Sequence, residues 1–97
     1  MKLLNENQII DLSELFKIFG DSTRVKIINV LLNQTLCVNE ISDAINLSQS
    51  AVSHQLIILK QSKLVKYKRL GNQTYYQLAD EHVEKIFRIG CEHINEI

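Results

Sequence analysis

The chain contains no proline, and it has few residues of the kinds that break or cross-link a backbone. Its 97 residues include three glycines and two cysteines. With so few helix-breaking residues, we expect the connections between elements to be few and sharp. Cys37 and Cys91 are too few and too widely separated for the disulfide framework of a small secreted domain, so we expect two buried, free thiols.

Long apolar runs are absent as well. No stretch approaches the roughly 20 apolar residues that a membrane span requires. Glu6 and Asp11 interrupt the apolar residues near the N-terminus, which argues against a secretory signal peptide. We therefore expect a cytoplasmic protein without a membrane partner. The length and the 45% hydrophobic content fit a single domain over 1–97, small enough to gain stability from dimerisation.

Acidic residues are missing from one long segment, although the net charge of the chain is zero. Residues 44–79 hold five basic side chains and no acidic one, whereas residues 80–97 hold two basic and five acidic side chains. A basic segment of this kind would concentrate an anionic partner on one surface. Five charges taken alone fit an ordinary solvated surface equally well.

Five segments carry apolar residues at three- and four-residue spacing, which is the pattern of amphipathic helices. These segments are 8–19, the stretch after Gly20, 38–45, 49–61 and about 80–96. Two β-prone runs flank Gly71 and Asn72, which predicts a β-hairpin over about 64–78. The predicted fold class is mostly α with a β-hairpin wing: a winged helix-turn-helix that forms a homodimer.

The helix-turn-helix is predicted over about 38–61, and its second helix starts with small polar residues. In such a motif the second helix enters the major groove, where hydrogen-bonding groups can contact base edges and phosphates. The wing would add basic side chains that reach the neighbouring backbone or the minor groove. The candidate DNA-binding residues are Ser48, Gln49, Ser50, Ser53 and His54 on the helix, with Lys66, Lys68 and Arg69 on the wing.

The last predicted helix, about 80–96, carries four side chains that could bind a metal ion: Asp80, His82, His93 and Glu96. Two imidazoles and two carboxylates suit a borderline ion such as zinc. His82 and His93 are 11 residues apart, or roughly 16 Å along a helix, so one ion cannot bind both within one subunit. The alternative is that the histidines are incidental and that Asp80 only caps the helix.

The angular positions of the two histidines nevertheless almost coincide. Eleven steps of about 100° amount to three turns plus about 20°, so both side chains lie on one stripe of the helix. An antiparallel pairing of two such helices across a two-fold axis would bring the Asp80 and His82 end beside the His93 and Glu96 end of the partner. This pairing predicts two identical intersubunit sites in each dimer.

Several motifs resemble those of one known family. The run LSQSAVSHQL at 47–56, the Leu64-Val65 pair, YYQL at 75–78 and FGDSTR at 19–24 are similar to the ArsR/SmtB family of bacterial winged-helix metal sensors. The resemblance covers nearly all of residues 10–96. It implies a dimeric repressor that binds double-stranded operator DNA, expected to be an inverted repeat, and that is released by a metal ion.

The resemblance also bears on the metal. Zinc-type members carry the Asp80, His82, His93 and Glu96 pattern on their last helix, which implies Zn(II) as the regulatory ligand, although Co(II) or Ni(II) could use the same donors. Thiolate-binding members carry a Cys-x-Cys pair where this chain has Cys37-Val38-Asn39, so sensing of arsenite, cadmium or lead there is disfavoured.

Three alternatives remain at this point. The first is a redox- or thiol-responsive winged-helix repressor that uses Cys37 and Cys91. The second is a zinc-dependent hydrolase, which we do not expect because four protein ligands leave no open position for water. The third is a DNA-binding dimer in which zinc is purely structural. Our expectation is a regulator and not an enzyme.

Overall fold

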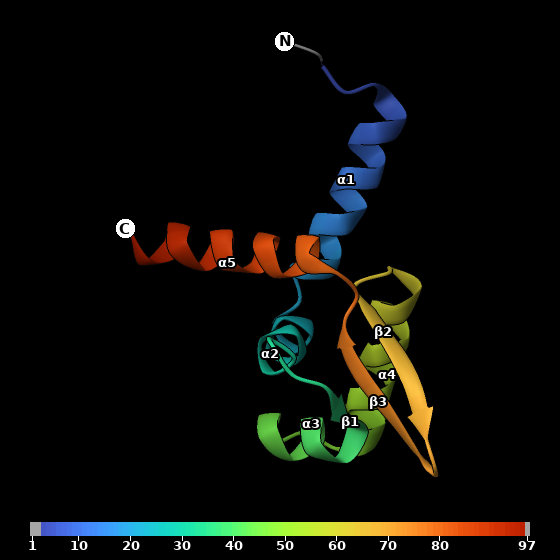
Figure 1. Ribbon diagram of the computed structural model, residues 1–97. Helices are drawn as coiled ribbons and strands as arrows, with labels where there is room; N and C mark the ends of the chain where they lie inside the picture. The colour runs from blue at the N-terminus through green and yellow to red at the C-terminus, as the bar shows by residue number, and fades with distance from the viewer. Residues whose placement is uncertain (1–2, 97) are drawn as a thin grey trace.

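The computed structural model describes residues 3–96, and helices account for most of this range (Figure 1). The elements follow one another as α1 (Glu6–Phe19), α2 (Ser22–Val30), β1 (Leu36–Cys37), α3 (Val38–Ile45), α4 (Gln49–Gln61), β2 (Val65–Leu70), β3 (Gln73–Leu78) and α5 (Glu81–Asn95). This order confirms the predicted winged helix-turn-helix. No helix within the described range is long and apolar enough to cross a membrane.

The helix ends follow from local hydrogen bonds of side chains. Asp21 accepts from the backbone N–H of Arg24 at 3.0 Å and so starts α2. The first helix begins two residues earlier than its apolar pattern predicts, because Asn5 and Gln8 form a reciprocal capping box at 2.9 Å in each direction. Asn46 ends α3 with φ of 56°, a left-handed conformation that asparagine tolerates better than most residues.

The core lies between the helices α2, α3 and α4, the start of β2 and the first turn of α5. Its fully or almost fully buried side chains are aliphatic: Ile27, Ile28, Leu31, Ile41, Val52, Leu56, Leu59, Leu64, Val65 and Val83. Helix α1 contributes no fully buried residue and packs on the outside of this core. The buried core therefore packs against the inner side of the helix-turn-helix, while most residues of α1 stay exposed to solvent.

The sheet has one strand more than the predicted hairpin. Its order is β1-β3-β2 and both pairs are antiparallel. Strand β1 pairs Leu36 with Tyr76 and Cys37 with Tyr75. Two residues are too short a run to show the alternating pattern that identifies a strand from sequence. The added strand buries the Cys37 side chain, as expected for that cysteine.

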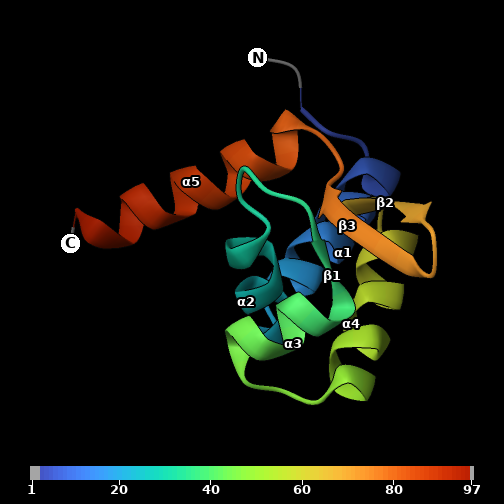
Figure 2. The same cartoon turned by 60° about the horizontal axis from the view of Figure 1, so that its bottom comes forward.

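Helices α1 and α5 project from the body of the molecule at one end. In Figures 1 and 2, α5 extends sideways from the core, and in Figure 1 the tip of the hairpin and α3 lie at the opposite end from α1. The radius of gyration is 14.6 Å, above the roughly 13 Å of a compact domain of this size. The chain thus presents two separate surfaces: a helix-turn-helix with its wing, and a pair of projecting helices.

Candidate nucleic-acid interface and metal site

The start of α4 is built around Ser48. Its hydroxyl oxygen accepts from the backbone N–H of Ala51 at 3.1 Å and lies 3.2 Å from the hydroxyl oxygen of Ser50. The cap fixes the N-terminus of the helix, where the remaining backbone N–H groups favour a phosphate oxygen. Ser48 therefore has a structural role as the cap of α4, whether or not it also contacts DNA.

The predicted DNA-binding side chains of α4 lie together on the side away from the core. Gln49, Ser50 and His54 are exposed and Ser53 is half-buried, whereas the core side of the helix carries buried aliphatic residues. Ile57 continues the exposed side one turn further and is 51% exposed. Ile57 is not among the residues predicted from the sequence, although its spacing of three from His54 places it on the same face.

The hairpin does not bring its three predicted basic residues together. In the register of β2 and β3, Lys66 lies opposite Gln77 and Lys68 opposite Tyr75, on one face of the sheet. Arg69 lies on the other face with Tyr67. A hairpin that contacts DNA with one face would use either the two lysines or the arginine there, and the DNA contacts of all three residues stay predictions.

The face that carries Arg69 is the one turned toward α4. The ammonium nitrogen of Lys60 lies 4.5 Å from the centre of the Tyr67 ring, a cation–π contact that joins the recognition helix to the wing. Tyr67 in turn lies against Tyr76, with ring centres 6.0 Å apart. Burial, together with the neighbouring Tyr67, raises the pKa of Tyr76 above its ordinary value.

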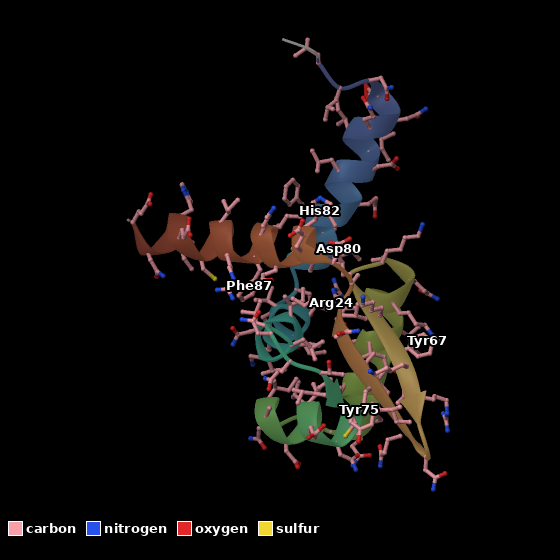
Figure 3. The ribbon with its side chains drawn as sticks, viewed as in Figure 1. Arg24, Tyr67, Tyr75, Asp80, His82 and Phe87 are labelled. Atoms are coloured by element: carbon pink, nitrogen blue, oxygen red, sulfur yellow. The ribbon has the colours of Figure 1, made fainter. Side chains whose placement is uncertain are left out.

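The predicted metal ligands lie at the two ends of α5. Asp80 is the N-cap residue: one carboxylate oxygen accepts from the backbone N–H of His82 at 2.9 Å and of Val83 at 3.3 Å. The same oxygen is 3.6 Å from Nδ1 of His82. The side chains of Asp80 and His82 are 54% and 81% exposed, and Figure 3 shows them near each other at the start of the helix.

His93 and Glu96 are exposed at the other end of α5. Within residues 3–96, no three side chains of the metal-binding types lie close enough to hold one ion. A single subunit thus brings Asp80 and His82 together but leaves His93 and Glu96 about three helical turns away. The arrangement across a dimer stays a prediction.

An apolar groove of about 420 Å³ lies where α1, α2 and α5 meet. It is lined by Phe16, Phe19, Val25, Ile86, Phe87, Gly90, Cys91 and Ile94. Cys91 is half-buried in this lining, whereas Cys37 is buried in strand β1 of the sheet, and both are free thiols. The two cysteines therefore belong to different parts of the fold.

Comparison with known proteins agrees with this geometry. The profile of the family described as bacterial regulatory protein, arsR family, matches residues 21–67. A transcriptional repressor SmtB homolog of Synechocystis sp. is 39% identical over 95 residues, which are 98% of this chain and 72% of the relative. A cadmium resistance transcriptional regulatory protein CadC homolog of Staphylococcus aureus is 37% identical over 99% of this chain and 80% of its own length.

The fold agrees with a solved structure of similar size. The crystal structure of the AntR antimony-specific transcriptional repressor superposes with a TM-score of 0.88 at 27% identity, and it covers 99% of this chain and 87% of its own. The match includes the projecting helices as well as the helix-turn-helix and the wing. The chain therefore belongs to the ArsR/SmtB family of helix-turn-helix transcriptional regulators, and it is not an enzyme.

Proposed function

We propose that this chain is a dimeric transcriptional repressor that binds an inverted-repeat operator and is released when zinc binds between the two C-terminal helices. The observation that carries the proposal is the spacing of side chains on one stripe of α5. His82, Ile86, Ile89, His93 and Glu96 recur at intervals of four, three, four and three residues. This is the spacing of a helix that packs along a second helix.

The exposure of the stripe supports a partner helix. Ile89 is 64% exposed although it is aliphatic, and it lies between the two histidines. The midpoint between His82 and His93 also lies midway between Ile86 and Ile89. A single two-fold axis at this point would therefore place His82 beside His93 of the partner subunit and Ile86 beside Ile89 of the partner subunit.

The groove beside this stripe supports the same dimer. Its lining is apolar on both α1 and α5, and Ile9, Ile10 and Leu12 of α1 are exposed as well. Such a large apolar surface on a chain of 97 residues is costly in water and is typical of an interface. A second copy of the chain, with the same exposed helices, is the partner that covers both surfaces symmetrically.

The donor groups on α5 fit a zinc ion. Asp80 uses one carboxylate oxygen for the helix cap, so its other oxygen is free to bind a cation. His82, His93 and Glu96 are exposed and can turn toward a partner helix. A bound ion would add metal–ligand bonds between subunits, and two imidazoles with two carboxylates complete a tetrahedral set without a position for water.

Release of DNA by zinc, instead of tighter binding, has to come from a change in the geometry of the dimer. Divalent cations added to the dimer would by themselves strengthen its attraction to phosphates. Release of DNA therefore requires that bonds between the two α5 helices fix an angle at which the two α4 helices no longer match half-sites about 34 Å apart. A thousandfold loss of operator affinity corresponds to a coupling free energy of about 4 kcal/mol.

The test is operator binding titrated with zinc. The operator is first selected from random double-stranded DNA with the metal-free protein, and we expect zinc to weaken binding to it by a factor of 100 or more, on the order of 3 kcal/mol. His82→Ala and His93→Ala should each bind the operator normally without zinc and fail to release it with zinc. Unchanged operator affinity in the wild-type chain at saturating zinc would contradict the proposal.

Mixed dimers distinguish an intersubunit site from one within a subunit. When His82→Ala and His93→Ala are refolded together, each heterodimer has one site with both substitutions and one site with neither. Neither parent homodimer should bind zinc tightly. We therefore expect tight zinc binding to reappear in the heterodimer. Heterodimers without tight zinc binding would show that the two histidines do not combine across the interface.

A further inference from the structure

The side chain of Arg24 joins three helices. It lies in the first turn of α2 and is half-buried. Its Nε donates to the carbonyl oxygen of Ile18 at 2.9 Å, and a terminal nitrogen donates to the carbonyl oxygen of Lys17 at 3.4 Å. These carbonyls belong to the last turn of α1, where helical partners run out, and that of Lys17 also accepts from the backbone N–H of Gly20 at 3.0 Å. Arg24 thus caps the end of α1.

The third bond of Arg24 reaches the recognition helix. Its other terminal nitrogen donates to the side-chain oxygen of Gln55 at 3.1 Å. Gln55 lies on α4 directly after His54, one of the candidate DNA-binding residues. No carboxylate within the described part of the chain forms an ion pair with Arg24, so its charge is directed at helix carbonyls and an amide. Figure 3 labels Arg24 beside α2, near the end of α1.

This link connects the two surfaces of the molecule. Helix α1 lines the apolar groove, while α4 packs mainly against α2, α3 and β2. The planar guanidinium holds its donors in a fixed fork, so its three acceptors are held in one relative position. If α1 moves with a partner subunit, the bond to Gln55 transmits that movement directly to α4.

We propose that Arg24 is a positioning residue for DNA recognition: through Gln55 it sets the angle of α4 relative to α1, and so the separation of the two recognition helices in a dimer. The inference rests on the proposed dimeric operator binding. It concerns a different step, because it involves neither the metal ligands nor a direct contact of Arg24 with DNA.

The test measures how strictly the protein selects the spacing between half-sites. Operators are compared that carry the selected spacing or one or two extra base pairs, each of which rotates one half-site by about 34° relative to the other. We expect the wild-type chain to lose at least tenfold in affinity for each altered spacing. Arg24→Lys keeps the charge but not the fork of donors, and it should reduce this loss to about threefold or less.

Gln55→Met supplies the matched variant, because it removes the amide and keeps the length and helix propensity of the side chain. It breaks only the bond to α4 and leaves the cap on α1, so it should relax spacing selection as Arg24→Lys does. The double variant should be no more relaxed than either single variant, since both remove one interaction. Gln55→Glu, which can still accept from Arg24, should keep wild-type selection.

Three outcomes would overturn the proposal. Unchanged spacing selection in Arg24→Lys, with a lowered melting temperature, would mean that Arg24 only caps α1. Equal weakening at every spacing in Gln55→Met, with no effect of Arg24→Lys, would mean that Gln55 contacts DNA itself. A wild-type chain without any spacing preference would contradict the dimeric operator as well, and it is recognised before any variant is made.

Discussion

At the scale of single residues, Asp80 has an observed role as the cap of α5 and a proposed role as a metal ligand. One carboxylate oxygen caps α5 by accepting two backbone N–H groups, and the other is free of hydrogen bonds to the described residues. The capping role alone would explain an aspartate at this position. Separating the two roles requires a substitution that keeps the cap and changes the metal donor.

Asp80→Asn makes that separation, because asparagine is as good an N-cap as aspartate but offers a neutral amide in place of a carboxylate ligand. We expect the melting temperature of the metal-free protein to stay within about 2 °C of wild type and zinc affinity to fall at least about tenfold. Asp80→Ala should lose about 1 kcal/mol of stability, or roughly 4–8 °C, in addition. Calorimetry with and without zinc measures both quantities, and wild-type zinc affinity in Asp80→Asn would remove Asp80 from the ligand set.

At the scale of elements, the alternation of side chains along β2 places its basic residues on two opposite faces of the hairpin. Lys66 and Lys68 point to one face of the sheet, whereas Arg69 shares the other face with Tyr67 and the Lys60 contact. Lys60, the one lysine or arginine of α4, contacts this second face at Tyr67, and Arg69 follows on the same face toward the turn at Gly71 and Asn72. This continuity makes Arg69 the stronger candidate for contact with DNA.

We therefore expect Arg69→Ala to lower the slope of log affinity against log salt by about 1, as the loss of one phosphate contact does. Lys66→Ala and Lys68→Ala should change the slope by less than half of that. Lys26→Ala, which removes an exposed charge on α2, controls for the change in net charge. The opposite order, with a larger effect of the two lysines, would place the other face of the hairpin against DNA.

At the scale of the whole molecule, two functions are separated along the fold. The helix-turn-helix and wing lie on a buried aliphatic core, whereas α1 and α5 project with apolar side chains exposed (Figure 1). A monomer of this shape leaves much of its apolar surface in water, which costs about 25 cal/mol for each Å². Association through α1 and α5 would stabilise both the fold and the spacing of the recognition helices.

Ile89→Asp tests this association, since it introduces a charge into the centre of the proposed α5 seam. We expect the variant to sediment as a monomer at concentrations where the wild type is a dimer, because an unpaired carboxylate in an apolar contact is strongly unfavourable. Leu70→Asp is the control: Leu70 is 56% exposed but lies at the hairpin tip, so the dimer should persist. A dimeric Ile89→Asp protein would exclude the antiparallel α5 pairing.

The sequence by itself determined the elements and the class of fold. The apolar periods predicted α3 and α4 with the same bounds that the structure has, and Ser48 and Asp80 were recognisable as caps because capping depends on neighbours within three residues. The stripe of candidate metal ligands on α5 was also visible, since the angular position of a residue on a helix follows from its number. Local interactions govern all of these features.

Only the tertiary structure decided the features that depend on distant parts of the chain. Strand β1 forms because β3 offers it backbone partners some 40 residues away, and a two-residue run has no sequence pattern that predicts this pairing. The link from Arg24 to Gln55 spans 31 residues between helices, and neither side chain stands out in a periodic pattern. The contact of Lys60 with Tyr67 shows which face of the hairpin is turned toward α4. Packing geometry, and not local propensity, fixes such contacts.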